Sequence, residues 1–234
     1  MSQLWSAILL SAGRAFADRW RALFHALLLP ICLQTLLGLI APREPVPVLL
    51  LWVAAQLIVS VALAVTAHRI ILLGLDLPAW AAVSWSERET RFLGWALVSG
   101  SLLAVSVLPL SVRELIESPL VWMLTAPVQG MAFILGTRLS LMLPAIAVGE
   151  SATPGAAWDL SRGSSLQVVC ALAVPFFAFE GLWLVVPEDA ALLELTTVQV
   201  LLGLVGGLTT TFEITVLSVC YRELKSRQGS RAAA

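Results

Sequence analysis

Charged residues are scarce in this chain. Only 12% of its 234 residues are Asp, Glu, Lys or Arg, whereas soluble domains carry about 25%. Hydrophobic residues make up 59% of the chain, and the mean hydropathy is +0.92. A soluble fold cannot bury that much apolar surface, but a lipid bilayer solvates it. The net charge of −1 leaves no basic surface that would indicate a nucleic-acid partner.

The residues that build catalytic and metal sites are also few. The sequence has only two histidines, His25 and His68, and its three cysteines all fall in apolar segments: Cys32, Cys170 and Cys220. Such a set makes a poor metal site and indicates no disulfide framework. The motifs of zinc proteases, phosphate-binding loops and serine hydrolases do not occur. The sequence therefore predicts no catalytic residue, no metal, no cofactor and no enzymatic activity.

Apolar runs of membrane-spanning length are what the sequence has instead. A helix needs roughly 20 mostly apolar residues to cross the hydrocarbon core, and six windows qualify. They are predicted at residues 22–41, 47–67, 92–111, 120–137, 166–187 and 196–220. The predicted fold is all-α, a polytopic transmembrane helical bundle over residues 22–220. A segment at 1–21 precedes it, and a basic cytoplasmic tail at 221–234 follows it.

The distribution of arginine and lysine predicts the orientation of these spans. With the N-terminus inside, 12 of the 14 basic residues fall in cytoplasmic segments, and the external loops hold only Arg43 and Arg113. Positive charge favours the cytoplasmic side. All nine tryptophans fall near a predicted interface, as in an aromatic belt. Both termini are therefore predicted to be cytoplasmic.

The six spans are predicted to form three parallel two-helix repeats. Each unit is an interfacial segment, an outward span, an external loop and an inward span that ends at an arginine: Arg69, Arg138 or Arg222. Arg19 precedes Arg69 by 50 residues, and Arg88 precedes Arg138 by the same 50. Because the units share one orientation, the repeat differs from the inverted kind of many transporters.

The segments that open the repeats are predicted to be amphipathic interfacial helices. In residues 1–21, polar residues line one face at helical spacing: Ser11, Arg14, Asp18 and Arg21. The second opening segment is predicted to begin at Asp76 and the third at Thr153-Pro154. Stretches 70–77 and 139–149 either continue the inward spans or, as an alternative, are re-entrant.

The arginine junctions carry a family resemblance. The stretch Arg138-Leu-Ser-Leu-Met-Leu-Pro-Ala-Ile-Ala-Val-Gly149 is followed by Ala157-Trp158 and Ser161-Arg162-Gly163, and His68-Arg69-Ile-Ile-Leu-Leu-Gly74 is the matching junction after the second span. They resemble a group of uncharacterised bacterial six-span inner-membrane proteins, related to the membrane portion of some glycerophosphodiester phosphodiesterases. The resemblance implies six spans and a bacterial inner membrane. It implies no activity, since the soluble phosphodiesterase domain does not occur here.

Two acidic residues, Glu180 and Glu213, fall well inside predicted spans. A charge at mid-bilayer costs at least ~2.5–3.5 kcal/mol, so such residues usually face the bundle interior. One hypothesis is a polar intramembrane site that relays protons or cations, extended by uncharged polar residues that include Gln129, Gln199 and Thr210. The alternative is that each protonated glutamate makes an interhelical hydrogen bond that holds the bundle together.

Two further patterns each allow a structural and a functional interpretation. Arg69, Arg138 and Arg222 are predicted to form a ring that binds an anionic lipid headgroup, because guanidinium pairs bidentately with phosphate. The alternative is that these arginines only set topology. Gly203-x-x-x-Gly207 predicts a close-packed helix contact, with a hinge as the less favoured alternative.

The sequence thus supports several function classes. The first is a non-enzymatic integral membrane protein that binds or organises membrane lipids or a partner, which is either a second copy or another membrane protein. The second is a small transporter or lipid translocator that uses Glu180 and Glu213. An intramembrane enzyme is the weakest, because no nucleophile with a facing base is evident.

Overall fold

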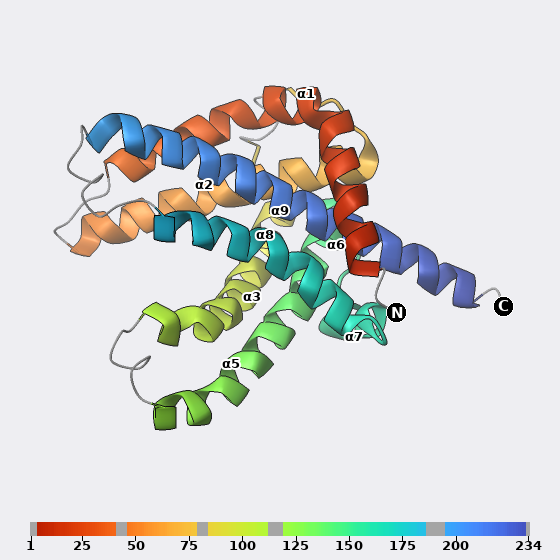
Figure 1. Cartoon of the computed structure of the whole chain (residues 1–234). Helices are drawn as coiled ribbons and strands as arrows, with labels where there is room; N and C mark the ends of the chain where they lie inside the picture. The colour runs from red at the N-terminus through yellow and green to blue at the C-terminus, as the bar shows by residue number, and fades with distance from the viewer. Residues whose placement is uncertain (1–3, 41–45, 79–83, 112–118, 186–194, 233–234) are drawn as a thin grey trace.

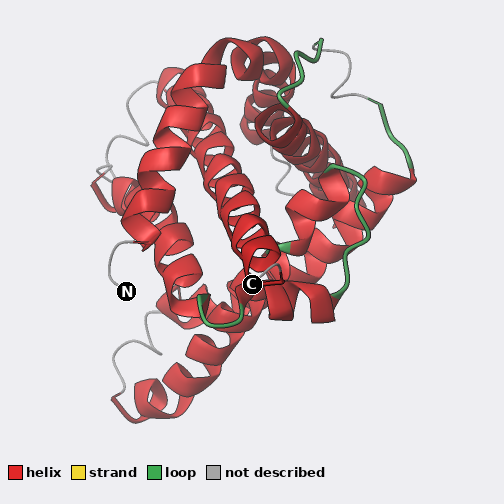
Figure 2. Ribbon diagram, turned by 90° about the vertical axis from the view of Figure 1, so that its right-hand side faces the viewer, coloured by secondary structure: helices red, strands yellow, loops and turns green. Residues whose placement is uncertain are grey.

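The computed structural model describes residues 4–40, 46–78, 84–111, 119–185 and 195–232. Every regular element within these ranges is a helix, and none of them contains a strand (Figure 2). The helices are α1 (Leu4–Leu39), α2 (Val46–Leu73), α3 (Glu87–Ser111), α5 (Pro119–Ser140), α6 (Met142–Ala147), α7 (Pro154–Ser161), α8 (Ser165–Val185) and α9 (Leu195–Ala232). The predicted all-α class is confirmed.

Four segments of the described chain are long and apolar enough to cross a membrane. They are Leu4–Leu39, Val46–Leu73, Met123–Ala147 and Val200–Ser230. Their outer surfaces are apolar: Leu51 of α2 is 73% exposed, Leu124 of α5 66% and Leu201 of α9 56%. Patches of this kind are rare on soluble monomers but fit a lipid-facing surface. The helices are therefore compatible with a multi-pass membrane protein.

The long helix α9 lies at the centre of the arrangement. It packs along α1, and also contacts α2 and α8, while α3 and α5 pair with each other and diverge from this group at one end (Figure 1). T-shaped packing of Phe16 on Phe212, with ring centroids 5.8 Å apart, joins α1 to α9. The first and last helices of the chain thus share an extensive interface.

Helix α1 combines the predicted opening segment with the predicted first span. It runs without interruption from Leu4 to Leu39, so no helix end occurs at residue 21, and it bends along its course (Figure 1). Ile8 and Ala12 are fully buried, whereas Arg14 and Asp18 are exposed. The polar and apolar faces read from the sequence therefore correspond to exposed and buried faces of α1.

Two glycines let α1 and α9 approach closely. A Cβ at Gly203 would lie 2.7 Å from Cγ2 of Thr35, and a Cβ at Gly207 would lie 2.7 Å from Cγ2 of Ile31. Both distances are too short for any side chain, so the α1 backbone can sit this near only because these positions lack one. The predicted close-packing role of the glycine pair is confirmed.

The C-terminal end of α2 and the N-terminal end of α7 follow local rules. Gly74 ends α2 with φ +67° and donates its N–H to the carbonyl of Ile70 at 3.1 Å, as a glycine after a helix C-terminus commonly does. Thr153 caps α7 by accepting a hydrogen bond from the Ala156 N–H at 3.1 Å, as its sequence predicted.

The stretches that follow Arg69 and Arg138 differ in structure. Residues 70–73 complete α2, whereas 74–78 are not helical. Residues 139–147 turn once at Leu141 and continue as the short α6, whose Met142 and Ile146 are buried. This segment therefore extends from the end of α5 into the protein interior. The predicted start at Asp76 is not seen, because the next described helix, α3, begins at Glu87.

Candidate functional site

A basic pocket lies where α1 meets the C-terminal end of α2. It has a volume of about 440 Å³, and three arginines line it with a single acidic residue: Arg14, Arg19, Arg222 and Asp18. Ser11 and Gly74 complete its polar lining. The three arginines are exposed, so they meet solvent or headgroups rather than the core. Three guanidinium groups against one carboxylate make the pocket a candidate anion site.

The end of α2 holds one of these arginines in place. Arg19 donates from Nη1 to the carbonyl oxygen of Gly74 at 3.2 Å. A Cβ at Gly74 would lie 2.8 Å from Nη2 of Arg19, so any side chain at this position would displace the guanidinium group. A guanidinium has five N–H donors, and one bond to the helix end leaves capacity for a phosphate.

The three arginines predicted to form a ring have separate surroundings. Arg222 lines the basic pocket. Arg69 lies within electrostatic range of Arg88 and Glu89. Arg138 stacks on Trp158, with its Cζ 3.8 Å from the ring centroid, and donates from Nη2 to Ser165 Oγ.

The contacts of Arg138 differ from those of Arg222. The Nε of Arg138 is buried, with no hydrogen-bond partner among the described residues. Its stacking on Trp158 of α7 and its bond to Ser165 of α8 join three helices. Arg222, in contrast, lines the basic pocket together with Arg14 and Arg19.

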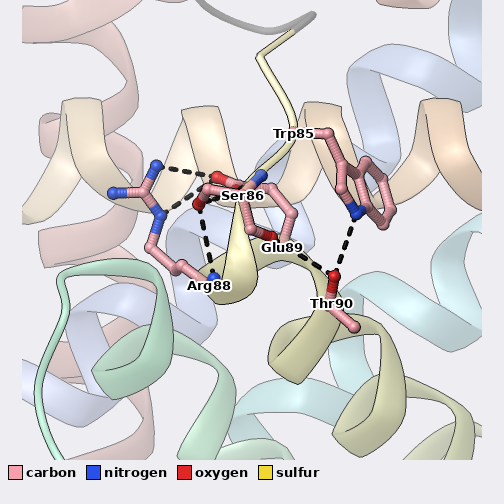
Figure 3. A network of polar contacts seen from close by, with 5 residues as sticks. All are labelled: Trp85, Ser86, Arg88, Glu89 and Thr90. Atoms are coloured by element: carbon pink, nitrogen blue, oxygen red, sulfur yellow. Dashed lines mark hydrogen bonds and ion pairs between the residues drawn. The ribbon is translucent and has the colours of Figure 1, made fainter.

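A second polar network fixes the start of α3 (Figure 3). Glu89 accepts a hydrogen bond from the backbone N–H of Ser86 at 2.8 Å and another from the Ser86 hydroxyl. The hydroxyl oxygen of Ser86 in turn accepts from the Arg88 N–H at 3.3 Å. Trp85 donates to Thr90 Oγ1 at 3.0 Å. The Ser86-x-x-Glu89 pair is a capping box, in which each side chain satisfies backbone donors of the first turn.

The Glu89 carboxylate is buried but well supported. Its side chain is 3% exposed, and Arg88 Nη2 lies 2.7 Å from its Oε1. Burial alone would raise the pKa of Glu89, but the hydrogen bonds from Ser86 and Arg88 outweigh it and hold the pKa below the ordinary value. Glu89 therefore stays ionised at neutral pH and keeps the turn before α3 in one conformation.

A third network ties the loop before α7 to α9. Lys225 Nζ lies 2.6 and 2.5 Å from the two oxygens of Glu150, and the Tyr221 hydroxyl donates to the same carboxylate at 2.6 Å. Burial raises the pKa of Glu150, but the hydrogen bonds from Lys225 and Tyr221 lower it by more. The pKa of this carboxyl group is therefore below its ordinary value. The side chains of Lys225 and Glu150 are about half exposed, so their ion pair adds little to the free energy of folding. Its main effect is to position the loop against α9.

The predicted intramembrane polar residues are only partly brought together. Glu213 lines a cavity of about 280 Å³ between α3, α5, α6, α8 and α9. Gln129 is buried elsewhere on α5 and donates to Thr125 Oγ1 at 2.8 Å. Thr210 is half-buried on α9. The side chains of Glu180 and Gln199 lie outside the described residues.

His68 is buried rather than interfacial. It is 1% exposed, packs on Phe92 with centroids 5.8 Å apart, and its Nδ1 lies 2.7 Å from Ser218 Oγ. Because the Ser218 hydroxyl donates to the Ile214 carbonyl at 2.8 Å, the ring Nδ1 is the donor to Ser218. In the described part of the chain, no three His, Cys, Asp or Glu side chains gather as a metal site requires.

Sequence reasoning missed two parts of these sites. The sequence assigns Arg14 only to an amphipathic face and Arg19 only to the start of the first repeat, although both join Arg222 in the basic pocket. The capping box was overlooked, although Ser86 followed three residues later by Glu89 is its sequence signature. The chain matches no protein-family model, no curated protein and no solved structure.

Proposed function

We propose that the chain is an integral membrane protein of a bacterial inner membrane that binds anionic lipid and is not an enzyme. Its topology in this proposal is six spans, as three parallel two-helix repeats with both termini cytoplasmic. The apolar exterior of the described helices supports membrane insertion. The basic residues at the inner ends of the spans support the orientation. The relation to the six-span bacterial family named above belongs to the same proposal.

The basic pocket is the observation that carries lipid binding. Arg14, Arg19 and Arg222 converge from the two ends of the chain beside the end of α2. Trp20, which directly follows Arg19 on α1, is 53% exposed, as interfacial tryptophans commonly are. Guanidinium groups at headgroup depth, beside an exposed aromatic, suit a phosphodiester better than a free polar metabolite.

Removing the pocket's charge is expected to weaken retention of anionic lipid. The variant carries Arg14→Gln, Arg19→Gln and Arg222→Gln. Each arginine near an anionic surface contributes about 1 kcal/mol, so we expect roughly a hundredfold loss of affinity for phosphatidylglycerol. Native mass spectrometry of protein released from phosphatidylglycerol-containing nanodiscs measures the retained lipid.

A control variant that loses the same three positive charges distinguishes binding at the basic pocket from general electrostatic attraction to anionic lipid. Arg91, Arg162 and Arg227 are also exposed, and none of them lines the basic pocket. Their triple change to Gln is expected to leave retention close to wild type. Equal losses in both triple variants would show that only total charge matters, and the pocket would then have no specific role.

A second candidate function is transport. Glu213 faces a cavity inside the bundle, and α5 and α8 carry internal prolines, Pro127 and Pro175, that favour kinked helices. In this proposal Glu213 and Glu180 pass a proton or cation across the membrane.

The transport proposal has its own test. In proteoliposomes loaded with a pH-sensitive dye, an imposed gradient is expected to drive proton entry through the wild type. Glu180→Gln and Glu213→Gln should each reduce the rate to that of empty vesicles, while Glu223→Gln should not. Equal rates in wild type and both variants would remove proton transport as a function.

A further inference from the structure

The cavity beside Glu213 is mostly apolar, and its few polar groups are suited to accepting hydrogen bonds. Its polar lining consists of one carboxyl group and four hydroxyls: Glu213, Ser99, Ser106, Thr137 and Ser140. No lysine, arginine or histidine lies among the described residues that line it. The rest of the wall is apolar and comes from five helices, so the cavity has the few convergent polar groups of a small-molecule site.

Three of the hydroxyls already donate hydrogen bonds to backbone carbonyl oxygens. Ser99 donates to the carbonyl of Trp95 at 2.9 Å, Ser106 to that of Leu103 at 2.6 Å, and Ser140 to that of Thr137 at 2.7 Å. A hydroxyl has one proton and two lone pairs, so these oxygens are left as acceptors. An ionised carboxylate is acceptor-only and has about four lone-pair positions, so another contact of Glu213 does not exhaust it.

We propose that this cavity binds the primary ammonium group of a small amphipathic amine, with Glu213 as the counter-ion. An ammonium offers three N–H donors and a positive charge, which complement the carboxylate and the serine oxygens. The apolar wall holds the short hydrocarbon body of the ligand. The volume of about 280 Å³ lies near the lower end of the range for ligand pockets, roughly 300–1,000 Å³, and limits that body to a small one.

The same lining disfavours the ethanolamine headgroup of a lipid. Its ammonium is attached to a phosphate, and the cavity offers that phosphate no cationic donor among its described lining residues. The occupant is therefore a free amine. This site is independent of the basic pocket, which α1, α2 and α9 form with opposite charge preference.

Calorimetric titration of the protein in phosphatidylcholine nanodiscs, corrected with empty nanodiscs, tests the proposal. The probe is n-pentylammonium, compared with n-pentanol and with n-pentyltrimethylammonium, which keeps the charge but lacks N–H donors. We expect the probe to bind about tenfold or more tightly than either analogue, and Glu213→Gln to remove that advantage. Equal binding of pentanol, or an unchanged affinity in Glu213→Gln, would overturn the assignment.

A matched pair of glycine variants keeps the test valid if Glu213→Gln does not fold. A Cβ at Gly100 or at Gly94 of α3 meets no heavy atom within 4 Å, but only Gly100 lines the cavity. Gly100→Leu should fill the cavity and abolish binding, while Gly94→Leu should bind like wild type. Binding that survives Gly100→Leu would place the ligand elsewhere. Competition by phosphatidylethanolamine in the nanodisc would instead assign the site to a lipid headgroup and contradict the free amine.

Discussion

Replacing Gly207 with valine is expected to destabilise the protein. The new Cβ would lie 2.7 Å from Cγ2 and 3.0 Å from Cγ1 of Ile31, whose β-branched side chain has little rotamer freedom to move aside. Overpacking of this kind typically costs about 1–3 kcal/mol. We therefore expect thermal unfolding in detergent, followed by tryptophan fluorescence, to occur several degrees lower.

Two further variants show whether the clash is the cause. Gly130 on α5 has no heavy atom within 4 Å of a built Cβ, so Gly130→Val tests the change in helix propensity without a clash and should not lower the unfolding temperature appreciably. Shortening Ile31 to Ala in the Gly207→Val background should recover part of the loss, because contacting positions are energetically coupled. Equal destabilisation by the two valines, with no recovery, would mean that close α1–α9 packing is not what Gly207 provides.

Changing Glu89 to Gln is expected to produce a pH-dependent loss of stability. At neutral pH the carboxylate holds the Ser86 N–H, the Ser86 hydroxyl and Arg88, and hydrogen bonds to a charged group contribute about 1.5–3 kcal/mol. Because the pKa of Glu89 is lower in the folded protein than in the unfolded chain, ionisation favours the folded state above the ordinary pKa of 4.5. That contribution disappears as the pH falls through the folded pKa.

The measurement compares unfolding temperatures of wild type and Glu89→Gln from pH 7 to pH 3. The gap between them should be widest at neutral pH and should close in acid. Glu87→Gln, at an exposed position of the same helical turn, controls for the loss of one negative charge near the N-terminus of α3. A gap that stays constant down to pH 3, or one that Glu87→Gln reproduces, would contradict the role given to Glu89.

The features that could be predicted are those set by local sequence. Helix type followed from the long apolar runs, and the start of α7 followed from Thr153-Pro154, because a cap acts within one turn. The glycine pair in α9 predicted a close contact, since Gly203 and Gly207 lie on one face. Each of these signals depends only on residues a few positions apart.

The features that could not be predicted depend on which helices become neighbours. Apolar residues are much alike in lipid, so nothing in the composition of α9 indicates that α1 is its main partner. For the same reason Arg222 could not be assigned to Arg14 and Arg19 rather than to Arg69 and Arg138. The cavity beside Glu213 needs residues from five helices, and serines that donate to their own helix look in sequence like ordinary small residues.

The contact between Phe16 and Phe212 also has a consequence for biogenesis. Nearly the whole chain separates these residues, and a bacterial or eukaryotic ribosome adds about 5–20 residues per second. Roughly 10–40 s of synthesis therefore pass between the emergence of the two rings. In the proposed membrane protein, lipid or the insertion machinery covers the face of α1 during that time, until α9 packs on it. A chain interrupted before α9 leaves that face without its partner.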